Sequence, residues 1–230
     1  MTKSAVFLAG TLCDDRVFGC LPHRFQNSKV LDHSALGDAR IAALNMVEAI
    51  PPGTLGIAFS LGSWVLLELA RLAPDRFSGI VLISGNAFPD APENAAKRRE
   101  RVARAREEGF AALFADDWDH IIGRERRYDP AVRSLIVKMA EAIGHDRHEQ
   151  QTEMNISRPD LRTMVENPPV PIHVIAGSDD GLCPRNRYEQ AAAAPGSSLT
   201  VLEGVGHYVP LEAPDALLGV IDRLFPEYAA

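Results

Sequence analysis

The clearest structural signal in the chain is the segment Thr54-Leu55-Gly56-Ile57-Ala58-Phe59-Ser60-Leu61-Gly62. Its first six residues predict a buried strand, and the apolar run from Leu61 to Leu72 predicts a helix, so that Ser60 stands at the junction. A serine on so tight a turn is forced into strained backbone geometry that exposes its hydroxyl, provided that small residues two positions away make room. Ala58 and Gly62 occupy those positions. Ser60 is therefore a candidate nucleophile.

Ser60 also has an ordinary interpretation, because serine is a preferred N-cap of helices. The motif reads Ala-x-Ser-x-Gly and departs from Gly-x-Ser-x-Gly by one methyl group at Ala58. Short motifs of this kind also occur by chance. The segment alone leaves both interpretations open, and the rest of the chain must separate them.

Apolar runs like the one before Ser60 recur along the chain and alternate with helical patterns. The predicted strands are Ala5 to Ala9, Lys29 to Asp32, Thr54 to Phe59, Gly79 to Ser84, Pro171 to Ala176 and Ser198 to Glu203. The predicted helices between or after them are Ala39 to Ile50, Leu61 to Leu72, Arg185 to Ala194 and Pro214 to Phe225. Most of the strands are continuously hydrophobic, as strands covered on both faces are. The alternation predicts an α/β fold with a doubly wound, mostly parallel sheet of about six strands.

The alternation breaks between Ser84 and Pro171, where no strand is evident. Four helical segments fill the gap: Asn94 to Glu108, Phe110 to Ile122, Ala131 to Ile143 and Asp146 to Ile156. A segment of this length between two sheet strands is not a simple loop. We expect a helical lid, residues 89–167, inserted over the carboxyl ends of the strands, with residues 1–88 and 168–230 forming the core.

Composition narrows the function classes. The chain has 230 residues, 46% of them hydrophobic, which suits one well-buried domain. A net charge of -7 and an isoelectric point near 5.5 argue against binding nucleic acid or an anionic membrane. No apolar run is long enough to span a membrane. Three cysteines do not form an even disulfide set, so a reducing cytoplasm is expected.

Two loops after later strands offer partners for Ser60. Pro171 to Ala176 is followed by Gly177-Ser178-Asp179-Asp180, and Ser198 to Glu203 is followed by Gly204-Val205-Gly206-His207. A serine nucleophile needs a general base within hydrogen-bond reach, and that base needs a third group to orient it. Because the carboxyl ends of parallel strands share one edge, these residues predict His207 as the base and Asp179 or Asp180 as the acid.

The segments Phe59-Ser60-Leu61-Gly62, Gly177-Ser178-Asp179-Asp180 and Gly206-His207 resemble the three signature blocks of the α/β-hydrolase family. The resemblance covers nearly the whole chain. It implies that the acid is Asp180, three residues after the glycine that ends its strand, with Asp179 as a turn residue or cap. It also implies an oxyanion hole built from the backbone N–H groups of Leu61 and Thr11. The family often has His-Gly-x at the latter place, where this chain has Ala9-Gly10-Thr11.

The resemblance implies a cofactor-free serine hydrolase that cleaves a carboxylic ester or thioester of a small molecule through an acyl-enzyme. Carbon-carbon bond hydrolysis and cofactor-free perhydrolysis would use the same triad. An alternative of another class is a non-catalytic ligand-binding protein on the same scaffold, but such proteins often lose members of the triad and this chain keeps all three. The acid loop from Asp180 to Arg185 also resembles that of pimeloyl-acyl-carrier-protein methyl ester esterases.

Other residues have less specific signals. Leu12, Cys13 and Phe88 are candidates for lining a substrate pocket, with simple packing as the alternative. Among the histidines only His145 and His148 approach the ligand spacing of a metal site, and no metal is assigned. A basic segment in the expected lid predicts a solvated helix face, and the esterase resemblance implies an acidic acyl carrier protein as its alternative partner. Its basic residues are Lys97, Arg98, Arg99, Arg101, Arg104 and Arg106.

Overall fold

The computed structural model describes residues 4–228, and its centre is a parallel sheet of six strands. The strands are β1 (Ser4–Leu8), β2 (Asn27–Leu31), β3 (Thr54–Phe59), β4 (Phe77–Ile83), β5 (Ile172–Gly177) and β6 (Ser198–Leu202). Their order in the sheet is β2-β1-β3-β4-β5-β6, and every neighbouring pair is parallel. The predicted fold class, a doubly wound α/β sheet, is confirmed.

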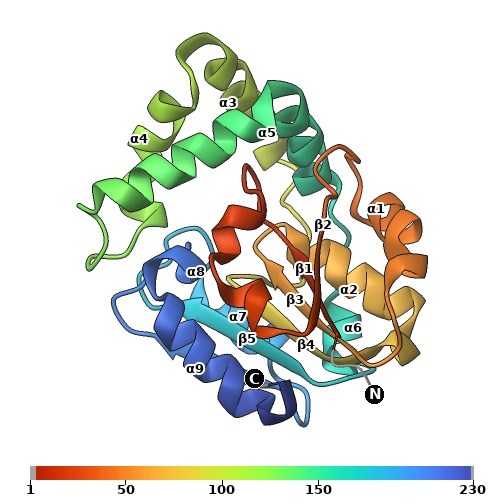
Figure 1. The fold of residues 1–230 in the computed structure, drawn as a ribbon. Helices are drawn as coiled ribbons and strands as arrows, with labels where there is room; N and C mark the ends of the chain where they lie inside the picture. The colour runs from red at the N-terminus through yellow and green to blue at the C-terminus, as the bar shows by residue number, and fades with distance from the viewer. Residues whose placement is uncertain (1–3, 229–230) are drawn as a thin grey trace.

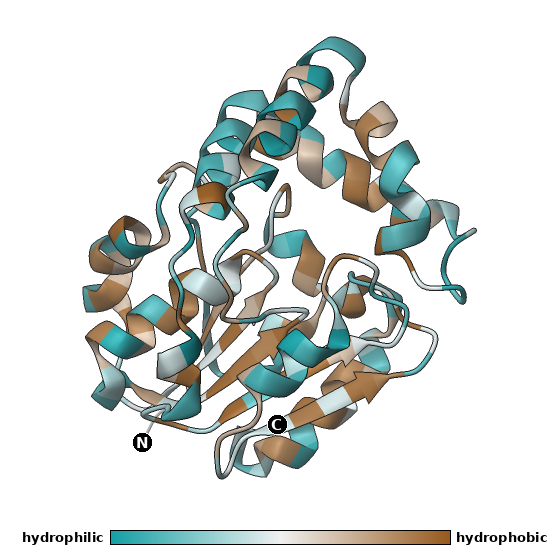
Figure 2. Ribbon diagram, turned by 180° about the vertical axis from the view of Figure 1, so that it is seen from behind, coloured by the Kyte–Doolittle hydropathy of each residue, from teal (hydrophilic) through white to brown (hydrophobic). Residues whose placement is uncertain are grey.

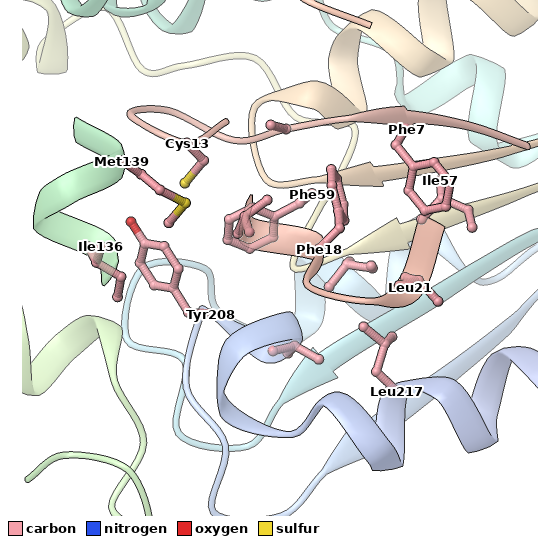
Figure 3. Packing of buried hydrophobic residues seen from close by; sticks show 14 of the residues in the cluster. Phe7, Cys13, Phe18, Leu21, Ile57, Phe59, Ile136, Met139, Tyr208 and Leu217 are labelled. Atoms are coloured by element: carbon pink, nitrogen blue, oxygen red, sulfur yellow. The ribbon is translucent and has the colours of Figure 1, made fainter. Parts of the chain in front are cut away.

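Two hydrophobic clusters cover the two faces of the sheet, because successive side chains of a strand point to opposite faces. Val6 and Leu8 of β1 pack with helices α1 (Ala39–Met46) and α2 (Gly62–Leu72). Phe7 packs on the other face, in the cluster that includes Leu217 of α9 (Pro214–Leu224). Figure 3 shows Phe7, Phe18, Leu21, Ile57 and Leu217 in that second cluster. Burial on both faces explains why the inner strands are mostly hydrophobic, as the brown strands of Figure 2 show, whereas the edge strands β2 and β6 are more exposed.

The chain leaves the sheet after β4 and forms four helices before β5. They are α3 (Asn94–Glu108), α4 (Phe110–Ile121), α5 (Pro130–Ser157) and α6 (Arg162–Glu166). In Figure 1, α3, α4 and α5 form a layer of their own beside one end of the sheet. Two predicted helices, Ala131 to Ile143 and Asp146 to Ile156, lie within the bounds of α5, where Gly144 leaves helical geometry with φ 78° and ψ 171°.

The inserted segment contacts the loops that follow the carboxyl ends of the strands. His207, after β6, donates its backbone N–H to the carbonyl of Ile121 at the end of α4. Gly181, after β5, donates likewise to His120. The side chain of Gln151 on α5 accepts the backbone N–H of Leu12, after β1. These contacts place the layer of helices over the edge of the sheet where all strands end.

The last part of the insertion belongs to the core instead. Leu161 and Val165, beside and within α6, pack in the same cluster as Ile172 of β5 and Tyr188 of α7 (Arg185–Ala191). Helix α6 is short and was not predicted, and neither was α8 (Val209–Glu212), because one turn of helix has too few residues for a periodic pattern. Among the described residues, no helix combines the length and apolar character needed to cross a membrane.

Candidate active site

Ser60 lies on a strained turn between β3 and α2. Its φ is 48°, in the left-handed region that side chains with a Cβ rarely adopt, and its N–H is held by the carbonyl of Ile83 at 2.9 Å. Gly62 allows this turn, since a Cβ there would lie 2.4 Å from the backbone oxygen of Leu8. The geometry is that of a nucleophile elbow rather than of a helix N-cap, because Ser60 makes no side-chain cap and Leu61 precedes the helix.

His207 lies between β6 and α8 with its ring against Ser60. Its Nε2 is 2.9 Å from the Oγ of Ser60, and the residue is 6% exposed. Its backbone is fixed at both polar atoms, because Ile121 accepts its N–H at 2.8 Å and its carbonyl accepts the hydroxyl of Ser84 at 2.7 Å. The ring packs 5.4 Å from that of Phe59. The imidazole is therefore held in position to accept the serine proton.

Asp180 meets the other side of that imidazole. Its Oδ2 is 2.8 Å from Nδ1 of His207 and 2.5 Å from the hydroxyl of Tyr188, which donates to it. Its Oδ1 accepts the backbone N–H groups of Leu182 and Cys183. Burial opposes ionisation of this carboxyl, but the charge and hydrogen bond of His207 and the other donors outweigh burial and hold its pKa below the ordinary value. A carboxylate is thus maintained beside the base.

Asp179 faces elsewhere. Its Oδ1 is 2.8 Å from Nη1 of Arg124, and its Oδ2 accepts the backbone N–H of the same residue. The structure therefore brings Ser60, His207 and Asp180 into one chain of hydrogen bonds and leaves Asp179 outside it.

The two expected oxyanion donors come from two different segments of the chain. Leu61 follows Ser60 directly, and Thr11 follows β1, the neighbour of β3 in the sheet. Within residues 4–228 neither backbone N–H has an acceptor, whereas the N–H of Leu12 is taken by Gln151 at 2.8 Å. The hydroxyl of Thr11 accepts an N–H of Asn155 at 3.0 Å. Leu61 and Thr11 thus keep free donors, while α5 holds the loop around Thr11.

Two residues that support this arrangement were not singled out from the sequence. Glu212 of α8 is buried, and its carboxylate accepts the backbone N–H groups of Gly123, Gly206 and Tyr208 at 2.7 to 2.9 Å. It therefore ties the His207 loop to the end of α4. Tyr188 is the second, through its bond to Asp180. A tyrosine or glutamate in an amphipathic helix gives no sequence signal for such a contact.

A cavity of about 380 Å³ opens next to Ser60. Thr11 and Leu12 line it, as do Trp64 and Cys183. Cys13 and Phe88 do not line it, contrary to the sequence-based expectation.

Cys13 and Phe88 lie outside the cavity lining for different physical reasons. Cys13 is 2% exposed, and its side chain turns into the hydrophobic cluster, where Figure 3 shows it near Tyr208 and Met139. The ring of Phe88 instead lies beneath the guanidinium groups of Arg162 and Arg187.

The basic residues of α3 mostly face carboxylates. Arg98 pairs with Asp90, and Arg99 pairs with Glu153 on α5. The remaining three arginines pair in the same way: Arg101 with Asp117, Arg104 with Glu108 and Asp116, and Arg106 with Asp146 and Glu149. Lys97 alone in this group has no carboxylate partner among residues 4–228. Most of the positive charge of this helix is therefore already matched within the chain.

Comparison with solved structures shows how widely this architecture is shared. An esterase from Thermogutta terrifontis superposes with a TM-score of 0.86 at 20% identity, covering 100% of this chain and 92% of that one. A bromoperoxidase from Bacillus anthracis gives a TM-score of 0.79 at 13% identity, covering 98% and 92%. A carboxylesterase structure from Nitrososphaera gargenis gives 0.77 at 15% identity, covering 98% and 92%. At such identities the likeness is one of fold.

Comparison of the amino-acid sequence with known proteins and family models identifies the family. No curated protein matches the chain by sequence. A model of the alpha/beta hydrolase family matches residues 15–220, which include Ser60, Asp180 and His207. Fold, site geometry and family match agree, and the chain belongs to the alpha/beta hydrolase family.

Proposed function

We propose that this protein is a serine hydrolase that cleaves a carboxylic ester or thioester of a small molecule through an acyl-enzyme. The observation that supports this most directly is the continuous hydrogen-bonded chain from Ser60 through His207 to Asp180, with distances of 2.9 and 2.8 Å. The nearby free N–H groups of Leu61 and Thr11 supply the second requirement of acyl transfer. A binding protein that does not turn over would need neither feature.

The geometry suggests the following sequence of steps. As Ser60 Oγ attacks the carbonyl carbon, its proton passes to Nε2 of His207, and Asp180 stabilises the imidazolium that forms. The N–H groups of Leu61 and Thr11 donate to the oxyanion of the tetrahedral intermediate. His207 then gives the proton to the leaving alcohol or thiol, which leaves an acyl group on Ser60. Water then attacks the acyl carbon while His207 takes its proton, and His207 returns that proton to Ser60 Oγ as the acid leaves.

Known neighbours in fold support an ester substrate. Solved structures of similar fold include an esterase and carboxylesterases, and another is described as an N-acyl homoserine lactone degrading enzyme. A carrier-protein partner has less support, because carboxylates of the same chain already match most of the α3 arginines.

The test is labelling with a fluorophosphonate probe, followed by hydrolysis of 4-nitrophenyl esters of increasing acyl length. We expect the probe to modify Ser60, and Ser60→Ala to lower kcat by at least about 10⁴-fold. Ser63→Ala is the matched control, because Ser63 is a buried serine in the first turn of α2 and should leave labelling intact. Ester hydrolysis that persists in folded Ser60→Ala would contradict the proposal.

A further inference from the structure

The cavity beside Ser60 has a charge opposite to that of the whole protein. Five cationic side chains line it: Lys97, Arg98, Arg101, Arg158 and Arg187. Asp117 is the one carboxylate among its lining residues, and Asp90 lies behind the wall as a partner of two of the arginines. Five positive charges against these two carboxylates and that of Asp180 behind His207 leave two in excess, in a chain whose net charge is -7. A cleft lined by one sign of charge attracts ligands of the other.

The cations in the wall differ in how far they are already neutralised. Arg98 and Arg158 share the single carboxylate of Asp90, whose side chain is 3% exposed. Arg101 pairs with Asp117. Lys97 and Arg187 have no carboxylate partner within residues 4–228, although both line the cavity. These two are the lining cations whose charge no carboxylate of the described residues already matches.

Arg158 gives the wall a fixed positive charge. Its side chain is 9% exposed, lies 4.5 Å from the ring centroid of Trp64 and donates to the carbonyl of Phe88 and the amide oxygen of Asn155. Burial lowers its pKa to about 10, so the guanidinium remains charged at neutral pH. A buried, hydrogen-bonded cation of this kind is costly unless a negative charge compensates it. Asp90 compensates Arg158 only in part, because Arg98 pairs with the same carboxylate.

The lining also has polar uncharged residues such as Asn86, Thr152 and Asn155, and its main apolar part comes from a different element. Helix α4 contributes Leu113, Phe114 and Ile121, next to Tyr208 from the His207 loop. The cavity therefore combines an apolar side with a cationic side, at a volume suited to a small ligand. An uncharged acyl chain would contact only the apolar side.

We propose that the substrate of this site carries an anionic group in addition to the ester or thioester bond, and that Lys97 and Arg187 bind that group. The inference rests on the proposed hydrolase function and specifies its substrate class. A carboxylate on the acyl side, a carboxylate on the alcohol side and a phosphate share the chemistry that these cations recognise.

The first test compares charged and uncharged esters of matched size. On the acyl side, 4-nitrophenyl hydrogen adipate is compared with 4-nitrophenyl hexanoate. On the alcohol side, 4-carboxyphenyl hexanoate is compared with 4-carbamoylphenyl hexanoate. We expect kcat/KM for one charged ester to exceed that of its neutral counterpart by about tenfold, and added salt to reduce the ratio. A ratio of one or less in both pairs would overturn the inference.

The second test uses variants with matched controls on the same helices. Lys97→Gln and Arg187→Gln should each lower the charged-to-neutral ratio of kcat/KM by about fivefold. Arg99→Gln on α3 and Arg185→Gln on α7 remove exposed arginines that do not line the cavity, and should leave the ratio unchanged. Equal effects of all four variants would show a general effect of net charge and contradict the assignment.

A binding measurement separates failure of this inference from failure of the proposed function. Calorimetric titration of Ser60→Ala with monomethyl adipate, uncharged methyl hexanoate and inorganic phosphate needs no turnover. We expect monomethyl adipate or phosphate to bind more tightly than methyl hexanoate, and Lys97→Gln in the same background to weaken that binding. No preference for either anion would refute the anion site even if esters are hydrolysed. Conversely, absence of fluorophosphonate labelling would refute the hydrolase and leave anion binding standing.

Discussion

Asp179 and Asp180 are neighbours in sequence with opposite surroundings, and this difference gives the sharpest prediction at the scale of single residues. Asp180→Asn should keep the shape of the site but let an amide N–H face Nδ1 of His207, which favours the wrong imidazole tautomer. We expect kcat for a 4-nitrophenyl ester to fall by about 10³- to 10⁴-fold. Asp179→Asn removes a charge that pairs with the exposed Arg124 and lies outside the hydrogen-bonded chain of Ser60, His207 and Asp180, and should leave kcat within about twofold.

Circular dichroism of both variants must show the native fold for the comparison to hold. If Asp179→Asn were the more damaging change to kcat in folded protein, the assignment of the orienting acid would be wrong. The pair therefore tests the geometry directly, at adjacent positions with the same chemical change.

The sequence indicated the polar residues of the reacting centre because each stands at a strand end in a recognisable context. The choice of Asp180 came from family resemblance, and the residues around it gave no independent reason. Glu212 and Tyr188 could not be found in this way. Glu212 accepts backbone N–H groups from Gly123, 89 residues away in sequence, and backbone donors leave no trace in side-chain patterns.

At the scale of elements, helix α5 controls the loop that follows β1. Gln151 accepts the N–H of Leu12, a residue with φ 58°, and Asn155 one turn later donates to Thr11. A helix of the inserted segment thus holds the loop with the expected oxyanion donor in a backbone conformation that is unfavourable for leucine. The inserted segment therefore fixes the loop that contains the expected oxyanion donor.

Gln151→Ala should therefore impair catalysis more than substrate binding. Without its acceptor the buried N–H of Leu12 is unpaired, the loop relaxes and the Thr11 donor moves, so we expect kcat to fall by about tenfold with KM changed by less than about threefold. Steady-state kinetics with a neutral 4-nitrophenyl ester measure this. Gln150→Ala is the control, since Gln150 is exposed on the adjacent position of α5. A rise in KM alone would indicate that Gln151 acts only on substrate contacts.

The elements themselves were predictable where the pattern was long. The strands and the helices α2, α3 and α9 have enough residues for periodicity to define them. The contacts of α5 were not predictable, because Gln151 and Asn155 fall among many polar residues of a helix with no sequence mark of what lies opposite. Nor did the sequence indicate that Leu161 and Val165 at the end of the insertion return to the core, since they are isolated apolar residues in a polar stretch.

At the scale of the whole molecule, sheet order explains the location of the site. β2 and β3 lie on opposite sides of β1, so the chain winds away from β1 in two directions, and ligands of open α/β sheets bind at such a switch point. The loop of Thr11 and the turn of Ser60 flank this point. Strand order was not predictable from the sequence, because the pairing of the strands depends on contacts far apart in the chain.

The same packing makes stability depend on pH through two buried histidines. Burial lowers the pKa of His33, after β2, to about 4. Burial, Arg101, His145 and Arg106 lower the pKa of His148 on α5 to about 4 as well. In the unfolded chain both titrate near 6.5. Above that pH neither state binds the proton, so the histidines do not affect stability there.

Below about pH 6.5 the unfolded chain takes up protons that the folded protein does not, so stability falls with pH and continues to fall towards pH 4. Between pH 7.5 and 5.5, each of these two histidines should cost about 1 kcal/mol of unfolding free energy. Urea unfolding at the two pH values measures the difference. His33→Gln should reduce it by about 1 kcal/mol whatever its effect on absolute stability, whereas His23→Gln, at an exposed position, should leave it unchanged. An undiminished pH difference in His33→Gln would mean that His33 is protonated in the folded protein, against its burial in the core.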